Sequence, residues 1–206
     1  MKNFCQICVW DKGRRPTHLR GYDAMINDLL IRQLTTDDIE SAYQVFETAI
    51  PDAFEKEGLG FLYKDLYRQI IVDKRRLVDA SLDHLDWDGL FLVAKLRETV
   101  IGTISFGICG DDIKKCTDSH FHSIGELGSL YVLPCYQNQG VGSALIKAIV
   151  MHLSDQGIDQ FCLDSGYKRA QKKWLKKFGA PYKVIKDYWP VSDQMIWLCK
   201  VSDFIE

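Results

Sequence analysis

The stretch ELGSLYVLPCYQNQGVGSALIKAIVMHL, residues 126–153, decides the fold. Residues 126–134 form an apolar segment that is typical of a strand and ends at a proline, and residues 143–153 have the apolar spacing of a helix. The polar turn between them contains Gly140 and Gly142. Free backbone N–H groups and the helix dipole favour a negatively charged ligand at a helix start, so the pattern predicts a phosphate-binding turn.

Two common phosphate-binding motifs do not match this turn. The dinucleotide fingerprint needs a third glycine where the chain has Leu145, and the Gly-Lys-Ser/Thr of the P-loop is missing. The remaining pattern is Gln137-x-x-Gly140-x-Gly142, directly after a strand that ends Tyr-Val-x-Pro. This composite resembles the acetyl-CoA pyrophosphate loop of the GNAT acyltransferase superfamily. The alternative is an ordinary β–α turn whose glycines permit tight packing.

The composition is that of an ordinary globular protein and does not indicate a nucleic acid or a membrane as partner. The 206 residues carry a formal net charge of -2, so nothing indicates nucleic acid or a membrane as partner. No apolar run approaches the roughly 18 residues of a membrane helix, and no signal peptide is expected. The cysteines are odd in number and lack framework spacing, which predicts a reducing compartment and hence a cytoplasmic protein.

The first residues are expected to lie outside the core. Residues 1–28 lack clear periodicity and are predicted to form an N-terminal extension before one domain over residues 29–206. Within them, Cys5-x-x-Cys8 is half of a zinc-site pattern, and His18 is the nearest further ligand. A structural zinc site needs four ligands, so the sequence predicts no metal and leaves the role of this cysteine pair open.

The rest of the chain alternates helix and strand signals. Expected strands cover residues 29–34, 90–94, 100–108, 122–132, 161–163, 183–188 and 195–201. Expected helices cover residues 39–51, 61–82, 140–155 and 167–177, the first of them ended by Pro51, and residues 110–119 are expected to form a polar loop. This order predicts an α/β fold, a single domain with a mixed central sheet flanked by helices, and it is also the order of the GNAT fold.

The resemblance to the GNAT superfamily covers roughly residues 29–201 and implies transfer of an acetyl group from acetyl-CoA to an amine. Many family members carry a glutamate that acts as general base on the strand before the loop, and Glu126 stands at that position. A carboxylate suits this role when burial raises its pKa towards neutrality. The alternative is a glutamate on the solvated side of a strand.

The resemblance also implies which residues bind the cosubstrate. In the family, the strand before the loop offers its backbone to pantetheine, which here implies Leu130, Tyr131 and Val132. The residues implied to face the pyrophosphate are Gln137, Asn138, Gln139, Gly140, Val141, Gly142 and Ser143. Gln137 replaces the arginine that some members have, so less fixed charge is expected to face the phosphates.

The last helix departs from the family pattern Asn-x-x-Ala-x-x-Phe-Tyr, whose tyrosine is the general acid. Alignment on Ala170 puts Tyr167 at the asparagine position and Trp174 at the tyrosine position. An indole N–H is not a working acid, so Tyr167 is the nearest candidate and Trp174 is expected beside the cofactor arm. Their spacing of seven residues predicts that both face the CoA sulfur. The alternative for Trp174 is a core position.

These observations favour an N-acetyltransferase that acts on a primary amine of a small molecule or peptide, with acetyl-CoA as cosubstrate. The alternative is a catalytically silent acyl-CoA-binding sensor or interaction module, which the missing helix tyrosine favours and Glu126 opposes. The sequence does not define the acceptor, which in this fold is shaped here by residues 51–82 and 182–197. A homodimer is left open as the assembly.

Overall fold

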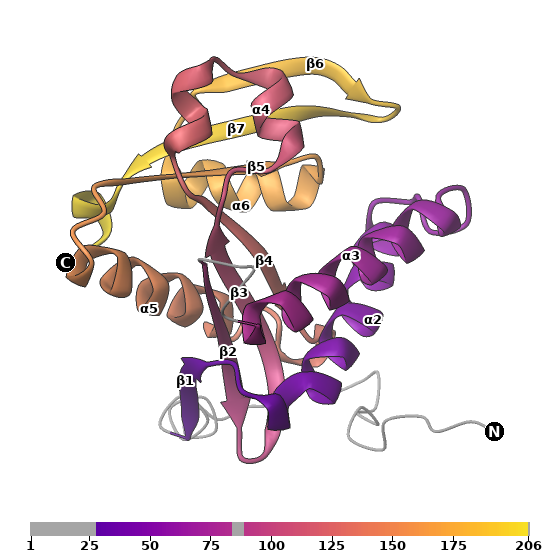
Figure 1. Ribbon diagram of the computed structural model, residues 1–206. Helices are drawn as coiled ribbons and strands as arrows, with labels where there is room; N and C mark the ends of the chain where they lie inside the picture. Colours follow the sequence, from indigo (N-terminus) through magenta and orange to yellow (C-terminus); the bar gives the residue numbers. More distant parts are fainter. Residues whose placement is uncertain (1–27, 84–88, 206) are drawn as a thin grey trace, which may run out of the picture.

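The structure is a computed structural model that describes residues 28–83 and 89–205 (Figure 1). Its centre is a seven-stranded sheet in the order β1-β2-β3-β4-β5-β7-β6. The strands are β1 (Leu29–Gln33), β2 (Leu90–Leu96), β3 (Thr99–Gly107), β4 (Glu126–Val132), β5 (Gln160–Ser165), β6 (Lys183–Trp189) and β7 (Ser192–Lys200). Within this sheet only β4 and β5 pair in parallel, which confirms the expected α/β fold with a mixed sheet. Residues 1–27, with Cys5, Cys8 and His18, lie outside the described residues.

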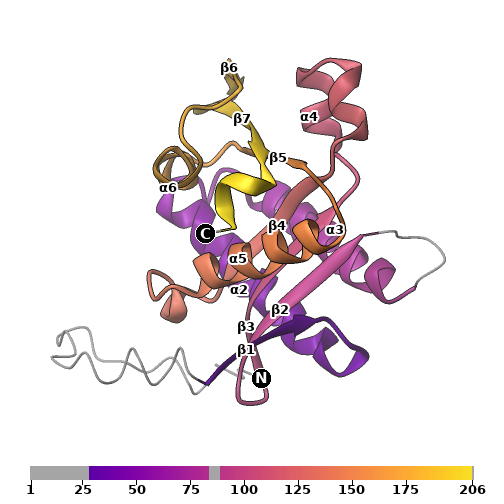
Figure 2. The same ribbon diagram turned by 90° about the vertical axis from the view of Figure 1, so that its left-hand side faces the viewer.

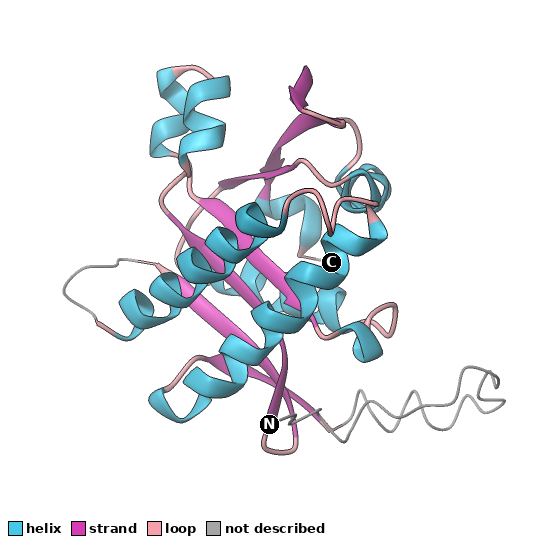
Figure 3. Ribbon diagram, turned by 90° about the vertical axis from the view of Figure 1, so that its right-hand side faces the viewer, coloured by secondary structure: helices cyan, strands magenta, loops and turns pink. Residues whose placement is uncertain are grey.

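Helices cover both faces of the sheet. α2 (Ile39–Lys56) and α3 (Lys64–Leu82) lie on one face, as Figure 3 shows, and α5 (Val141–Asp155) lies on the other face, towards the viewer in Figure 2. α6 (Lys168–Phe178) joins the α5 side, because Trp174 and Phe178 pack into the same hydrophobic cluster as α5. None of the helices in the described ranges is both long and apolar enough to cross a membrane.

α2 continues beyond the proline that was expected to end it. Pro51 lies inside the helix, which runs to Lys56. A proline removes one backbone N–H and crowds the preceding turn, at about 3 kcal/mol in a helix interior. Phe54, only 3% exposed, extends the apolar stripe past Pro51, and its burial offsets about 1.5–3 kcal/mol of that cost. Tertiary packing therefore overrides the local stop signal.

The segment between β3 and β4 forms a helix, so the expected polar loop over residues 110–119 is wrong. α4 (Asp111–Cys116) carries acidic residues in its first turn and lysines in its last, which complements the helix dipole. With the following 3-10 turn (Ser119–Ser123) it buries Ile113, Cys116 and Phe121 in one cluster with residues of β5 and β7. β4 accordingly begins at Glu126, four residues later than expected.

The parallel contact between β4 and β5 is limited to one residue pair, Glu126 with Cys162. Beyond it, β4 contains a bulge, because Ser129 and Leu130 together stand opposite Ile104 alone. Ser129 has a φ of 50°, in the left-handed region. The ladder is therefore open between residues 127–132 of β4 and 163–165 of β5, a feature called here the β4–β5 opening.

The last two strands form a hairpin at one edge of the sheet. β6 pairs with β7 and is the outermost strand, and both strands differ by a few residues from the expected bounds. Their register shifts between Ile185 and Trp189, and Asp187 in this stretch has a φ of 51°. β6 is therefore an irregular edge strand.

Candidate functional site

The turn between β4 and α5 leaves the N-terminus of α5 uncapped. Pro134 opens a 3-10 turn, and Asn138 and Gly140 adopt positive φ values of 59° and 81°. Gly140 is the N-cap residue and no side chain caps the helix; the backbone N–H of Ala144 bonds the Gly140 carbonyl at 2.9 Å. The N–H groups of the first turn therefore remain available to an anion. A Cβ at Gly142 would touch only Val132 Cγ2, at 3.9 Å, so this side of the turn is open.

The glutamine side chains of the turn brace it from within. Gln137 donates from Nε2 to the carbonyl of Val132 at 3.0 Å, and Gln139 donates to the carbonyl of Cys135 at 2.6 Å. Gln137 also donates its backbone N–H to the Pro134 carbonyl at 3.3 Å, so this residue shapes the turn through both its side chain and its backbone. Neighbouring helices supply two cations that contact the turn.

These cations are Lys56 at the end of α2 and Lys173 on α6. Lys56 donates to Gln137 Oε1 at 3.0 Å and also pairs with Asp52, while Lys173 donates to Asn138 Oδ1 at 3.3 Å. The basic face of α6 therefore reaches the turn through at least one lysine. Positive charge at this place suits a phosphate ligand.

The backbone of β4 turns alternately towards β3 and towards the β4–β5 opening. Leu133 donates its N–H to Ile101 of β3 at 2.9 Å, so by antiparallel alternation Tyr131 also bonds β3, where it is paired with Thr103. Val132 then directs its N–H and carbonyl away from β3. The Val132 carbonyl accepts the Gln137 side chain, so its N–H is the group left towards the opening, while Tyr131 pairs with Thr103 and Leu130 lies in the bulge. That these three residues bind pantetheine stays a prediction. The neighbouring Ser129 hydroxyl is buried and has no hydrogen-bond partner in the described structure.

Glu126 lies at the point where the β4–β5 opening begins. It is half-buried, and one carboxylate oxygen, Oε2, accepts the backbone N–H of Gly110 at 2.6 Å. Burial raises the pKa of Glu126, while the Gly110 bond and the charge of Lys74 act in the opposite direction. A Cβ at Gly110 would come within 2.8 Å of the same oxygen, so a side chain at this position would displace the carboxylate from its present place. A carboxylate with a raised pKa is suited to accept a proton near neutral pH.

A second carboxylate, Asp164, was not identified from the sequence. It lies on β5 two residues after Cys162, the partner of Glu126, so the two carboxylates share one face of the sheet. Burial raises the pKa of Asp164 to about 7, with help from the charges of Glu126 and Asp112. Gln194 donates to Asp164, and Trp189 in turn donates its indole N–H to Gln194 at 2.8 Å.

Lys74 on α3 interacts electrostatically with the same pair of carboxylates. Burial lowers the pKa of Lys74, and the charges of Glu126 and Asp164 counteract the shift. Its position on the helix is the available sequence signal, because it lies four residues after Ile70 and four before the buried Val78. A lysine on the inner stripe of an amphipathic helix is unusual and indicates a role beyond packing.

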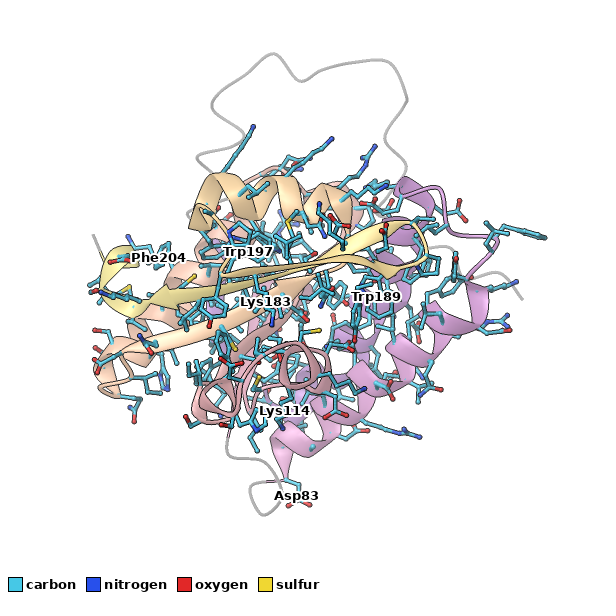
Figure 4. The ribbon with its side chains drawn as sticks, turned by 90° about the horizontal axis from the view of Figure 1, so that it is seen from above. Asp83, Lys114, Lys183, Trp189, Trp197 and Phe204 are labelled. Atoms are coloured by element: carbon cyan, nitrogen blue, oxygen red, sulfur yellow. The ribbon has the colours of Figure 1, made fainter. Side chains whose placement is uncertain are left out.

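α4 and the β6–β7 hairpin lie beside one another at the upper end of the molecule. Figure 4 looks down on them and shows Lys114 on α4, with Lys183 and Trp189 at the two ends of β6. Tyr188 of β6 donates its hydroxyl to Asp112 of α4 at 2.9 Å and thereby links the two elements. The aromatic residues near the C-terminus thus take part in hydrogen bonds around the carboxylates as well as in closing the sheet.

Tyr167 and Trp174 do not share a helix face. Tyr167 is the N-cap of α6 with an extended backbone, φ -86° and ψ 118°, so helical spacing does not apply to it. Its ring packs edge-on against Phe54 of α2 at 5.6 Å, and burial raises its pKa. Trp174 packs against Phe178 at 5.5 Å on the α5 side of the sheet. The expectation that both rings face one region is therefore wrong, and their roles in catalysis stay predictions.

The described residues contain no group of three or more His, Cys, Asp or Glu side chains arranged to hold a metal ion. Four of the described cysteines, Cys109, Cys116, Cys162 and Cys199, are buried and form no disulfide. They pack as small apolar residues, as expected for Cys162 and Cys199. Cys5 and Cys8 lie outside the described residues.

Comparison with known proteins identifies one family and one fold. The sequence profile of the Acetyltransferase (GNAT) family matches residues 43–180. Among curated proteins, the chain is similar to the acetoin utilization protein AcuA of Bacillus licheniformis, at 23% identity over 64 residues; the match spans 31% of this chain and only 30% of AcuA.

Solved structures give a longer match at low identity. One is a protein from Desulfovibrio desulfuricans assigned to the GNAT family, with a TM-score of 0.63 and 17% identity over 84% of this chain and 99% of that one. Another is the PaiA N-acetyltransferase of Thermoplasma acidophilum in complex with coenzyme A, with a TM-score of 0.54 and 20% identity over 82% of this chain and 98% of that one. At these identities the likeness shows a shared fold.

The buried carboxylate of Asp164 predicts a pH-dependent stability. Its pKa is higher in the folded chain than the ordinary 3.8, so the folded state loses stability as pH rises from about 4 to about 7. Asp164→Asn keeps an acceptor for Gln194 and removes the charge. We expect it to raise the free energy of unfolding at pH 8 by on the order of 1–4 kcal/mol, with little change at pH 4. Urea unfolding at both pH values measures this difference, and an equal effect at both would contradict it.

Proposed function

Because the chain belongs to the GNAT acetyltransferase family, we propose that it transfers the acetyl group of acetyl-CoA to a primary amine of a small molecule or a peptide. The observation that carries the proposal is the placement of Glu126 where β4 leaves β5, in the same strand that feeds the uncapped N-terminus of α5. One strand thus connects a proton acceptor with an anion-binding turn.

In this proposal the turn holds the pyrophosphate of acetyl-CoA. The backbone N–H groups of Val141, Gly142 and Ser143 face the phosphates, and Gly140 supplies the left-handed conformation that the turn needs. Gln137, Asn138 and Gln139 shape the turn, and Lys56 and Lys173 add positive charge. The backbone N–H of Val132, with Leu130 beside it, is offered to the pantetheine arm in the β4–β5 opening, because the Val132 carbonyl already accepts the Gln137 side chain. Acetyl-CoA supplies the activated thioester.

Glu126 then acts as the general base for the acceptor amine. An amine must lose a proton before or during attack on the thioester, and a carboxylate of raised pKa can accept it near neutral pH. Asp164 lies on the same face with a pKa of about 7 and is placed to share that proton. The hydrogen bond from Gly110 fixes the Glu126 carboxylate on one side and leaves the other oxygen for the substrate.

No residue is required at position 174 as an acid. A thiolate is a tolerable leaving group near neutral pH, because the ordinary pKa of a thiol is about 8.5. Tyr167 is retained as the candidate donor, since its partly buried ring packs against Phe54 of α2 in the cluster to which Tyr131 also belongs. Trp174 is proposed to support the cofactor side of α6 through its packing.

The alternative is a catalytically silent acyl-CoA-binding sensor or interaction module. Burial of two carboxylates and a lysine together is expensive for a protein that only binds. Release of free CoA from acetyl-CoA on addition of pooled amines supports the transferase, and tight binding without release supports the silent module. The buried unpaired cysteines agree with the proposed cytoplasmic location, and a homodimer remains a proposal for the assembly.

The phosphate-binding role of the turn is testable at Gly142. Gly142→Asp places a carboxylate in the first turn of α5, where it favours the helix but repels a pyrophosphate, and the site has room for the side chain. We expect acetyl-CoA to bind at least about tenfold more weakly, which corresponds to about 1.4 kcal/mol. Isothermal titration calorimetry measures the change. Gly142→Ala is the matched control and should change the affinity little; equal affinities for the two variants would contradict the assignment.

The general-base role of Glu126 is testable by its pH dependence. Glu126→Gln keeps the bond from Gly110 and removes the proton acceptor, so kcat/KM should fall by roughly 10²–10⁴ at pH 6. The loss should shrink towards pH 9, where more of the acceptor is already the free amine. Asp164→Asn and the double variant show whether Asp164 takes over the proton. Unchanged kcat/KM between pH 6 and 9 in Glu126→Gln would refute the role.

A further inference from the structure

α3 carries one charged side chain on its inner stripe. Tyr67, Ile70 and Ile71 pack against the hydrophobic cluster around α2, and Val78 is fully buried in it. Lys74 lies between them on the same stripe and is only partly exposed, whereas Lys64 at the start of the helix is exposed. Lys74 is therefore directed towards the sheet rather than towards solvent.

Apart from Lys64, the other charged residues of α3 each have a bonding partner. Asp65 pairs with Arg68, Asp73 pairs with Arg76, Arg75 pairs with Glu47 on α2, and Asp79 accepts the hydroxyl of Tyr43. Lys74 forms no ion pair within the described part of the chain, and its electrostatic neighbours are Glu126, Asp164 and Asp73. Leu127 packs in the cluster on the α5 side of the sheet, so the adjacent Glu126 faces the opposite side, where α3 carries the amine of Lys74 without an ion-pair partner.

We propose that Lys74 is a site of self-acetylation, modified by the active site of its own chain. The inference rests on the proposed function, because it requires acetyl-CoA in the β4–β5 opening and Glu126 as proton acceptor. It adds an acceptor that belongs to the chain itself. Burial lowers the pKa of Lys74, which increases the fraction present as the nucleophilic free amine.

The reaction balances without any further reactant. The free electron pair of Lys74 Nζ attacks the thioester carbon of acetyl-CoA; a C–N bond forms, the C–S bond breaks, and CoA leaves as a thiolate. The amine proton passes to Glu126 and from there to the thiolate or to water. The products are Nε-acetyl-lysine at position 74 and free CoA.

Acetylation would change the site in two ways. It removes the positive charge that lowers the pKa values of Glu126 and Asp164, so both carboxylates would hold their protons to higher pH. It also leaves a neutral amide where the free amine lay. The modified protein is therefore expected to accept protons from other amines less readily at neutral pH.

The experiment is incubation of the purified protein with acetyl-CoA and no added amine. Peptide mass spectrometry should find acetylation at Lys74 before the exposed Lys64, which serves as control on the same helix. Because Lys74 faces its own sheet, the fraction of Lys74 modified per unit time should not depend on protein concentration. A fraction per unit time that rises in proportion to protein concentration overturns the inference, and so does acetylation of Lys64 as fast as that of Lys74.

Glu126→Gln separates enzymatic from chemical acetylation. If Glu126 takes the proton, the variant should modify Lys74 at least about tenfold more slowly. Chemical acetylation should instead become faster, because loss of a nearby negative charge increases the free-amine fraction of Lys74. Gly142→Asp should slow the modification in proportion to its loss of acetyl-CoA affinity. An unchanged or faster rate in Glu126→Gln overturns the proposal.

An independent readout comes from the free protein. In protein labelled with ¹³C-lysine, the NMR signal of Lys74 should titrate at lower pH than that of Lys64, and Glu126→Gln should lower its midpoint further. Identical titrations of the two lysines overturn the premise that Lys74 is directed towards Glu126. Acetylation of added amines without modification of Lys74 overturns this inference and leaves the proposed function intact. Absence of acetyl-CoA binding by calorimetry overturns both.

Discussion

The structure depends on the interruption of hydrogen bonding between β4 and β5 after a single residue pair. A continuous parallel ladder would satisfy every backbone group of β4 and leave no place for a ligand between the strands. The bulge at Ser129 bends β4 away, so the strand remains in the sheet through β3 while one side becomes open. The turn, the start of α5 and the carboxylates all take their positions from that departure.

The interruption also concentrates charge. Glu126 and Asp164 lie on the two strands that part, and each is half-buried. Burial raises the pKa of both carboxyls, the charge of Glu126 raises that of Asp164 further, and the charge of Lys74 lowers both. The buried chain from Trp189 through Gln194 to Asp164 holds one of them in place. The site is thus a balanced charge cluster rather than an isolated base.

The sequence predicted the features that are local. The glycine turn, the helix after it and the mixed sheet follow from signals within short windows, and all are present. The predicted helix end at Pro51 and the predicted loop in place of α4 were wrong, because the packing of Phe54 and Ile113 outweighed the local signals. Asp164 and Lys74 were missed for a related reason: each stands in an ordinary strand or helix pattern, and only the fold brings them to Glu126. Tyr167 was misplaced because the start of α6 lies one residue later than expected.

The outer edge of the sheet has a consequence for how copies of this chain meet. An edge strand with unpaired backbone groups invites a second molecule to extend the sheet. β6 is such a strand, but Asp187 adopts a left-handed conformation within it and the register with β7 breaks there. Lys183, which is exposed at the start of the strand, adds a charge that two stacked edges would bring together. The molecule therefore protects itself against strand-to-strand aggregation at the same hairpin that supports Asp164.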